Sequence, residues 1–455
     1  MVAHGDGPDF GRAGGVGKGG SIPRREFFGG VLGAASLALA PVAGTARGSG
    51  ALRSGSPWRP PEDEPIDRAA MTPRRLQINP GDDLSQHVLE ADSGELLVVP
   101  PGSYAWNHPV LITRDHFGVC GEGDLDVTIR IPGGVGHDAR WHLFTNNGHN
   151  FLFENLVIES KGTACPRCAS AGGGDGLFHR LQFRTKEGPD FSFAEPGKVF
   201  AASTRAGAHL MLNSITYHNR GNLTYRSHGF LWASSPGDLT VRNCVITGFS
   251  DNGVYTRMPG RMTVQNCVFA NITPSAIRIG GDNEVVRHCT FWMDTSRGQL
   301  HNLDASQGGT AVNTSGIMAD RRERASDGGT VEHCSFLVLR TPFATGAVRM
   351  FDNRRLTLRH CQFLLNQSNI PAIGVQNPVD ELRVEHCVFV TENASGATVA
   401  RPIRGRYRAS GNAIGPGLVP GALAADAPAV AFDWDRAHRF PDDADFRFLS
   451  PPPNA

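Results

Sequence analysis

The sequence lacks an excess of charge of either sign. Its 455 residues include 44 basic and 44 acidic side chains, which gives no support for binding to nucleic acid or to a charged membrane surface. After the N-terminal region, no stretch is long and apolar enough for a transmembrane helix. Long amphipathic helical periods are also absent from most of the chain, and this favours an all-β fold.

The N-terminal region has the pattern of an export signal. Arg24 and Arg25 are followed by two phenylalanines, by a mildly apolar run over 29–40 and by a small-residue site ending at Ala46. The pattern resembles a twin-arginine (Tat) signal peptide and implies the Tat translocase as a transient partner, with an extracellular, periplasmic or cell-surface destination. The alternative is a short membrane anchor, but the run is short and rich in Gly and Ala.

Four regions are predicted along the chain. Residues 1–46 are the signal peptide, and residues 47–77, rich in Ser, Gly, Pro and Arg, form a disordered linker. Residues 78–415 are the folded domain, and residues 416–455 lose its sequence pattern and form a C-terminal cap or tail.

One short motif recurs six times within the folded domain. It reads apolar, any residue, Asn or His, Cys, any residue, apolar, and its third position is occupied by Asn243, Asn266, His288, His333, His360 and His386. Weaker copies place Asn155, Arg180 and Ser214 in the same slot. Four of the five intervals between successive copies are 22 to 27 residues long, and one is 45 residues long. A repeat of this length is typical of a solenoid.

The apolar spacing in the motif predicts a bend. Val241, Cys244 and Ile246 are separated by steps of three and then two, whereas an unbroken strand would keep a step of two. The chain is therefore expected to turn at Asn243, since Asn tolerates the left-handed backbone conformation. A further strand precedes each bend, giving three short strands per turn. The one long interval is interpreted as a turn with a long loop over 296–314.

This organisation resembles the right-handed parallel β-helix of the pectate-lyase-like superfamily. The resemblance covers residues 78–415 and includes "GDDLSQHVLEADSGELLVVPPGSY" as the N-terminal capping helix and first strand, and "GVCGEG" as the first turn. It implies a single-domain solenoid of about ten to eleven turns. Proteins of this fold include lyases, hydrolases, epimerases and binding proteins.

The motif cysteines are predicted to be packing residues. They follow the bend at an inward position and should form a column of buried thiols that behave as small apolar side chains, namely Cys244, Cys267, Cys289, Cys334, Cys361 and Cys387. Metal binding or disulfides are the alternative, but in-register parallel side chains suit neither well. The histidines of the motif are likewise expected to occupy bends and not to bind metal.

Cys165 and Cys168 stand apart from the column. Their CxxC lies in a Gly-rich segment, and a local disulfide is the favoured interpretation for an exported protein, with free thiols, a zinc half-site or a redox pair as alternatives. The sequence has no second CxxC, so a four-cysteine zinc site is not expected. Cys120 is expected to pack in the first turn.

The resemblance places a substrate groove along the first strand of each turn. Two outward columns are predicted there: Leu231, Tyr255, Arg278, Met318, Arg349 and Gly374, and beside them Ala233, Arg257, Gly280, Asp320, Phe351 and Gln376. Arginine's planar fork suits a carboxylate, and aromatic rings suit a sugar face. The ligand implied is an acidic polysaccharide.

A polysaccharide lyase acting on a uronate by β-elimination is the favoured activity. Such a lyase needs a base and positive charge beside the carboxylate, and the candidates are Arg278, Arg349 and Arg257. Candidate substrate-binding residues are Tyr255, Trp232, His228, Asn252 and Phe351. In pectate lyases calcium is held by acids of this region, which makes Asp251, Asp282 and Asp320 candidate Ca²⁺ ligands, although they form no dense cluster in the sequence.

Two alternatives remain open. A non-catalytic surface protein could use the same groove to bind glycans or to build part of an envelope. A glycoside hydrolase needs paired carboxylates, and the paired aspartates of the sequence, 82–83 and 442–443, lie outside the repeats, so the hydrolase ranks below the lyase.

Overall fold

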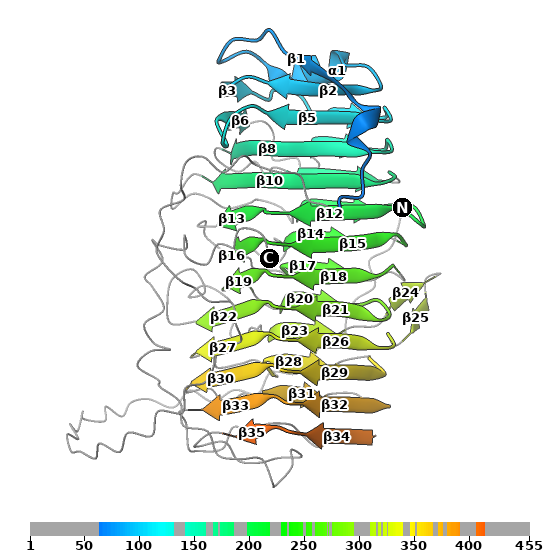
Figure 1. Cartoon of the computed structure of the whole chain (residues 1–455), viewed down its shortest axis with the longest axis vertical. Helices are drawn as coiled ribbons and strands as arrows, with labels where there is room; N and C mark the ends of the chain where they lie inside the picture. The colour runs from blue at the N-terminus through cyan, green and yellow to red at the C-terminus, as the bar shows by residue number, and fades with distance from the viewer. Residues whose placement is uncertain are drawn as a thin grey trace, which may run out of the picture. The chain divides into compact units, whose positions relative to one another are not determined.

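The computed structural model describes the chain over the following residues: 63–131, 142–160, 167–171, 173–185, 198–218, 229–233, 236–248, 252–256, 260–270, 272, 275–294, 310–314, 317–319, 322–324, 326–339, 346–350, 353–366, 372–375, 380–391 and 406–414. They form a right-handed parallel β-helix, as the resemblance implies. Strands from successive turns lie side by side and pair in parallel (Figure 1).

One face of the β-helix is a ten-stranded parallel sheet. We refer to it as the groove sheet, because its strands correspond to the predicted groove. Its strands in spatial order are β4 (Val110–Ile112), β7 (His142–Asn146), β9 (Arg167–Ala171), β11 (Lys198–Ser203), β14 (Gly229–Ala233), β17 (Val254–Thr256), β20 (Ser275–Ile279), β23 (Thr310–Thr314), β28 (Val348–Met350) and β31 (Ile373–Val375).

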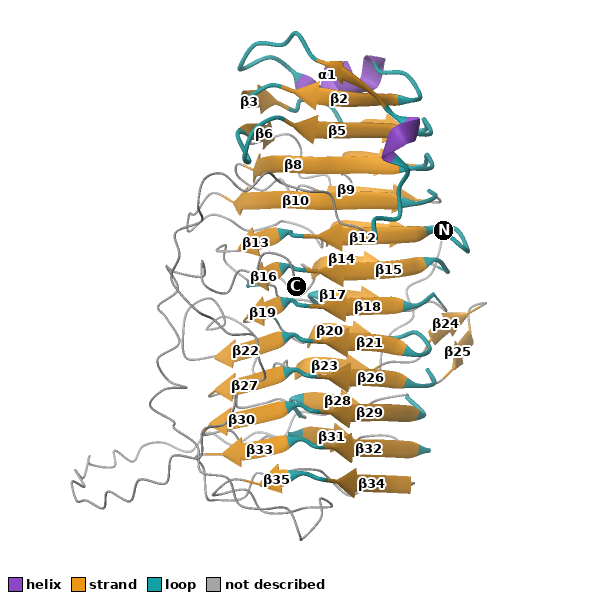
Figure 2. Ribbon diagram, viewed as in Figure 1, coloured by secondary structure: helices purple, strands orange, loops and turns teal. Residues whose placement is uncertain are grey.

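All but two of the other described strands form a 23-stranded sheet. A bend that runs along this sheet divides its strands into two rows (Figure 2). The first row contains β1 (Thr72–Arg75), β2 (Glu95–Val99), β5 (Phe117–Gly121), β8 (Phe151–Ser160), β10 (Gly176–Thr185), β12 (His209–Asn213), β15 (Asp238–Arg242), β18 (Met262–Gln265), β21 (Glu284–Arg287), β26 (Gly329–Glu332), β29 (Arg355–Arg359), β32 (Glu381–Glu385) and β34 (Arg406–Ser410). The second row contains β3 (Gly102–Ala105), β6 (Val127–Ile131), the ends of β8 and β10, β13 (Thr216–His218), β16 (Val245–Thr247), β19 (Val268–Ala270), β22 (Thr290–Asp294), β27 (Ser335–Leu339), β30 (Gln362–Asn366), β33 (Val388–Thr391) and β35 (Ala413–Ile414).

The predicted bend between the two rows is confirmed. Every residue in the slot has a positive φ, from 51° at Arg180 to 56° at Asn155 and Ser214, and from 52° to 54° at the six Asn and His positions of the strong motif. Successive side chains of a strand point to opposite faces, and the left-handed residue interrupts this alternation once. The apolar residues on both sides of the bend can therefore point inward. The motif histidines stack, with ring centroids 5.0, 4.8 and 5.1 Å apart along His288, His333, His360 and His386.

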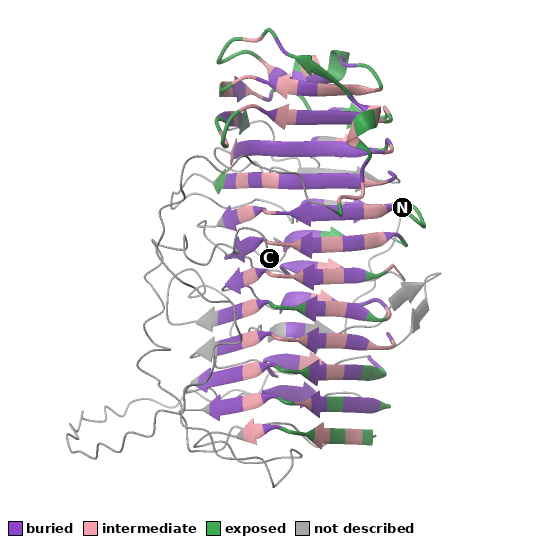
Figure 3. Cartoon of the chain, in the orientation of Figure 1, coloured by how far each residue is buried: buried purple, intermediate pink, exposed green. Residues whose placement is uncertain are grey.

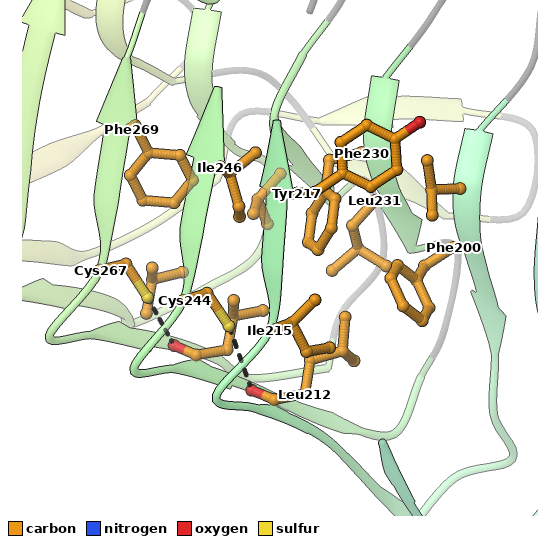
Figure 4. Close-up of a cluster of buried hydrophobic side chains, with 14 of the residues drawn as sticks. Phe200, Leu212, Ile215, Tyr217, Phe230, Leu231, Cys244, Ile246, Cys267 and Phe269 are labelled. Atoms are coloured by element: carbon orange, nitrogen blue, oxygen red, sulfur yellow. Dashed lines mark hydrogen bonds between the residues drawn. The ribbon is translucent and has the colours of Figure 1, made fainter. Parts of the chain in front are cut away.

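The core lies inside the turns, and most strands contain buried residues along much of their length (Figure 3). The six motif cysteines are 0 to 2% exposed and free, as predicted. Figure 4 shows Cys244 and Cys267 in successive turns, with Ile215 in the corresponding place one turn earlier. Beside them runs a column of aromatic rings, in which Phe291, Phe336 and Phe363 stack at 4.9 and 4.5 Å.

Three details of the prediction need correction. The predicted count of ten to eleven turns is slightly too high. The helix of the N-terminal cap, α1 (Leu84–Glu90), is real, but β1 precedes it and already pairs with β2. The region predicted as a loop over 296–314 contains β23, which continues the groove sheet between β20 and β28.

The N-terminal end of the described chain forms a strap on the outer face of the first row. We define the strap as residues 63–71, which include the 3₁₀ helix η1 (Arg68–Ala70) and fall inside the predicted linker. Ile66 and Met71 are buried against Leu152, Leu177 and Met211. The strap is ordered because these strands carry apolar residues on their outer face, and the two strap side chains cover them.

The strap also completes a buried charge cluster. Arg68 donates two hydrogen bonds to the carboxylate of Glu154, at 2.7 and 2.9 Å, and Glu154 is fully buried. His179 Nδ1 lies 3.3 Å from the same carboxylate. Burial alone would raise the pKa of Glu154, but the hydrogen bonds from His179 and Arg68 outweigh burial and lower it. Among the described residues, no helix is long and apolar enough to cross a membrane.

Candidate functional site

The candidate site is the outward column of the groove sheet. Strand register aligns one residue from each of six consecutive strands: Trp232, Tyr255, Arg278, Asn313, Arg349 and Gly374. The residues that flank the column on the same strands alternate to the inside, as the two-residue period of a strand requires. Leu231, Val254, Ile277 and Val348 are at most 1% exposed.

The column changes character along the β-helix. Trp232 is 42% exposed, although a large apolar ring is usually covered. Tyr255, on the next strand, and Arg278, one strand further, are half-buried. An aromatic pair is thus followed by a cation on the same outer face.

Tyr255 and Arg278 form a defined contact. The guanidinium carbon of Arg278 lies 4.6 Å from the centroid of the Tyr255 ring, a cation–π geometry. The Nε of Arg278 is buried and has no hydrogen-bond partner in the described part of the chain. The Tyr255 ring therefore orients the guanidinium of Arg278.

Arg349 occupies the same column two strands beyond Arg278, with Asn313 between them in register. At a strand spacing of about 4.8 Å, the two arginine backbones lie roughly 10 Å apart. Both arginine side chains are half-buried. The column thus places two arginine side chains along the direction in which the turns stack.

The structure corrects two members of the predicted column. Leu231 points into the core and its neighbour Trp232 is the outward residue. Met318 does not lie in the groove sheet, because β24 (Ile317–Ala319) forms an antiparallel hairpin with β25 (Arg322–Arg324), and Asn313 takes its place. The segment around Met318 was predicted to be a groove strand because it is apolar and follows a Gly.

The second predicted column is described at two positions. Ala233 is 3% exposed and points inward, and Gly280 follows the end of β20 in a buried position. The other candidates of that column, and two residues of the preceding loops, lie outside the described residues: Arg257, Asp320, Phe351, Gln376, His228 and Asp251.

The structure describes the contacts of two further candidates, Asn252 and Asp282. Asn252 is 4% exposed, and its backbone carbonyl accepts a hydrogen bond from the backbone of Phe230. Asp282 accepts a hydrogen bond from the backbone amide of Asp327 at 2.8 Å, which joins the corners of two successive turns. Within the described residues, no group of three or more His, Cys, Asp or Glu side chains is arranged to hold a metal ion. The calcium site remains a prediction.

The predicted disulfide also remains a prediction. Cys165 lies outside the described residues, and Cys168 is described only as a backbone position in β9, where it pairs with Phe144 and Phe200. Cys120 lies half-buried in β5 at the predicted first turn. Burial raises the pKa of the Cys120 thiol to about 12, so it is protonated at neutral pH.

Sequence reasoning missed a buried acid beside the column. Glu284 begins β21 at an inward position and is fully buried. Its carboxyl group accepts hydrogen bonds from Thr256 Oγ1 at 2.8 Å and from the backbone amide of Gly280 at 3.1 Å. Burial raises its pKa to about 8 despite these bonds, so the group is largely protonated at neutral pH. The available signal was a charged residue at a position that the neighbouring turns fill with Leu239, Met262 and Gly329.

These features define a right-handed parallel β-helix protein with an aromatic and cationic column on one sheet. Residues 228–401 match the family described as "Right handed beta helix region". A comparison with curated proteins finds no match to the sequence.

Solved structures that resemble the chain include three carbohydrate-related enzymes. A catalytic unit of α-1,3-glucanase from Streptomyces thermodiastaticus is 12% identical (TM-score 0.41), with 78% of this chain and 69% of that chain covered. DFA-IIIase from Arthrobacter chlorophenolicus is 12% identical (TM-score 0.43; 80% and 87% covered). An alginate lyase in complex with a trisaccharide is 13% identical (TM-score 0.37; 81% and 90% covered). None of the three identifies a substrate for this chain.

Proposed function

We propose that this chain binds an acidic, uronate-containing polysaccharide along the groove sheet and cleaves it by β-elimination. The observation that carries the proposal is the outward column in which Trp232 and Tyr255 precede Arg278 and Arg349. Aromatic faces suit the apolar face of a sugar ring, and arginines suit carboxylates. A linear polymer with repeated carboxylates meets both requirements at once.

The proposed reaction uses Arg278 at the reacting sugar. A base removes the proton on the carbon beside the carboxylate, that electron pair forms a carbon–carbon double bond, and the bond to the glycosidic oxygen breaks. The leaving oxygen takes up a proton. Arg278 is the candidate base, as an arginine is in pectate lyases, and Arg349 is the candidate to neutralise a carboxylate, which stabilises the charge that develops in the transition state. A Ca²⁺ ion beside the carboxylate remains part of this proposal.

Export belongs to the same proposal, since a large polysaccharide is met outside the cytoplasm. Replacing Arg24 and Arg25 together by Lys should abolish export through the Tat route, and fractionation of cells that express the two forms tests this. Unchanged export of the Lys form would contradict the assignment.

The activity is tested by incubating the chain with pectin, polygalacturonate, alginate and glycosaminoglycans, with and without calcium. A lyase produces unsaturated uronides that absorb in the ultraviolet, together with new reducing ends. Reducing ends without absorbance would indicate a hydrolase and would overturn the elimination. Binding without either product would support the non-catalytic alternative, which has its own observation: none of the six column positions, Trp232 to Gly374, is an acid.

The matched variants are Arg278→Ala and Arg287→Ala. Arg287 is an exposed arginine of β21, away from the groove sheet, that hydrogen-bonds to Gln265. We expect the first variant to lose about 10²- to 10⁴-fold in kcat/KM, the range for a lost acid–base group, and the second to retain full activity. Full activity of Arg278→Ala would remove it as the base.

A further inference from the structure

The cysteine ladder has a geometry that packing alone does not require. We define the ladder as Cys244, Cys267, Cys289, Cys334, Cys361 and Cys387. Each of the first five accepts a backbone hydrogen bond, at 2.8 to 2.9 Å, from the residue that follows the next ladder cysteine, for example from Val268 to Cys244. The six cysteines are thereby held in register, one strand spacing of about 4.8 Å apart.

All six thiols are free and buried, and they sit among backbone carbonyls. Each sulfur lies 3.1 to 3.4 Å from the carbonyl oxygen of the residue two positions earlier. Each of the first five also lies 3.4 to 3.8 Å from a carbonyl oxygen of the preceding turn. The S–H group of each cysteine can therefore donate to a carbonyl oxygen, and these partly negative oxygens would also stabilise a cation bound beside the sulfurs.

A disulfide fits this arrangement poorly. A disulfide needs Cβ atoms about 3.8 Å apart and a Cβ–S–S–Cβ torsion of about 90°, whereas in-register parallel side chains point the same way and keep their Cβ atoms about one strand spacing apart. A metal between two sulfurs is a better match, because two metal–sulfur bonds, each about as long as the 2.3 Å zinc–thiolate bond, span about 4.6 Å when placed end to end. The side chains point in the same direction across the stacking axis, so a linear sulfur–metal–sulfur unit would lie along that axis.

We propose that the cysteine ladder is a binding site for soft monovalent cations, Cu(I) or Ag(I), each held linearly between the sulfurs of two neighbouring cysteines. Soft sulfur ligands select these ions, and both ions form linear two-coordinate complexes. Zn(II) prefers four tetrahedral ligands, which parallel in-register side chains cannot supply.

The charge balance of the site fits a buried position. One thiol of each pair loses its proton to the solvent and binds as thiolate, while its partner binds as a neutral thiol. The cation and the thiolate cancel, so the buried unit stays neutral and avoids the cost of an isolated buried charge. Six cysteines taken two at a time give three cations.

The test compares two triple variants with the same number of thiols. The background is the full chain with Cys120, Cys165 and Cys168 replaced by Ser. The alternating variant, Cys267→Ala, Cys334→Ala and Cys387→Ala, leaves thiols two turns apart. The block variant, Cys244→Ala, Cys267→Ala and Cys289→Ala, leaves three thiols on consecutive turns. Both are refolded without oxygen in chloride-free buffer with silver nitrate alone, because the folded ladder is closed to solvent.

Native mass spectrometry and thiolate-to-metal charge-transfer absorption give the stoichiometry. We expect three Ag(I) on the parent, one on the block variant and none on the alternating variant, with a higher Tm only where silver is retained. Zn(II) should be retained by none. Equal silver binding by the two triple variants would overturn the proposal, since adjacency would then not matter.

A second measurement keeps the proposal testable if the alternating variant does not fold. X-ray absorption of the silver-loaded parent should show two sulfur neighbours in line. Three or four neighbours, or nitrogen neighbours, would contradict it, as would a parent that refolds without retaining silver.

Discussion

The aromatic rings of the core pack differently in the turns before Cys244 and in the turns after it. In the later turns, Phe269, Phe291, Phe336, Phe363 and Phe389 stack nearly parallel, with interplanar angles of 4° to 9°. In the earlier turns, rings from both sheets meet edge to face: Phe200 of the groove sheet contacts Phe178 at 69° and Phe183 at 82°. Where the same aromatic residue recurs in successive turns, the rings stack in a column. Where the residues vary, the rings pack against one another across the interior.

The outer face of the first row also differs between the earlier and the later turns. Under the strap, the outward residues are apolar and include Leu152, Leu177 and Met211. Beyond it, the corresponding positions are half-buried Thr240, Thr263, Val285, Thr330 and Thr357. Gly118 lies where a Cβ would meet the strands as well as the strap, with Leu96 at 2.8 Å, Leu152 Cβ at 3.0 Å and Met71 Sδ at 3.3 Å. The earlier turns therefore rely on contacts from outside the repeat, and the later turns rely on the repeat itself.

Breaking the aromatic column should have the largest effect. Phe336 is fully buried between two parallel rings, and Phe336→Ala leaves a cavity in the middle of the column. We expect a loss of about 3–5 kcal/mol in the free energy of unfolding, measured in urea. Phe336→Leu is the control and should cost less than about 1.5 kcal/mol. An alanine variant as stable as the leucine variant would show that the column does not stabilise the later turns.

Breaking the strap should be almost as costly to the earlier turns. Arg68→Met leaves the buried carboxylate of Glu154 without its main cation, and we expect a loss of about 3 kcal/mol. The matched control is Arg354→Met, since Arg354 pairs with Asp380 on the exposed surface and should contribute below about 1 kcal/mol.

Adding Glu154→Gln to Arg68→Met separates charge from packing. The double variant should recover part of the lost stability, because the remaining buried group is neutral. If the double variant is no more stable than Arg68→Met, the strap acts only through Ile66 and Met71.

The buried acid at the start of β21 should make stability depend on pH. Glu284 has its pKa raised from 4.5 to about 8 in the folded chain, chiefly by burial. Between these values the folded state binds the extra proton, so stability is highest below the lower pKa and falls as pH rises toward 8. The loss should be on the order of 2–3 kcal/mol from pH 5.5 to 7.5. Glu284→Gln should remove this slope, and a slope unchanged by the variant would contradict the assignment.

The later turns could be predicted from the sequence because each residue role recurs. The slot at Asn243 and His288, the buried Cys244 and the inward Phe291 follow from one spacing rule applied turn after turn. Even the weak copies at Arg180 and Ser214 adopt the predicted positive φ.

The candidate site was predicted less well, because outward residues follow no repeat. Tyr255, Arg278 and Arg349 were placed in one column correctly, but a register slip of one residue exchanged Leu231 for Trp232. The strap was missed for another reason: it depends on contacts between residues far apart in the sequence, such as Arg68 with Glu154, and no local pattern indicates those contacts.

The smallest expected effect distinguishes the bend from the histidine stack. His360 has φ 54° and stacks on His333 at 4.8 Å. If the slot selects residues for the left-handed backbone, His360→Asn should change the free energy of unfolding by less than about 0.5 kcal/mol, while His360→Val should cost about 1–2 kcal/mol, because a β-branched side chain clashes in that conformation. Urea unfolding of the two variants measures the difference. An Asn variant as unstable as the Val variant would mean that the stacked imidazoles, and not the backbone preference, hold the later turns in register.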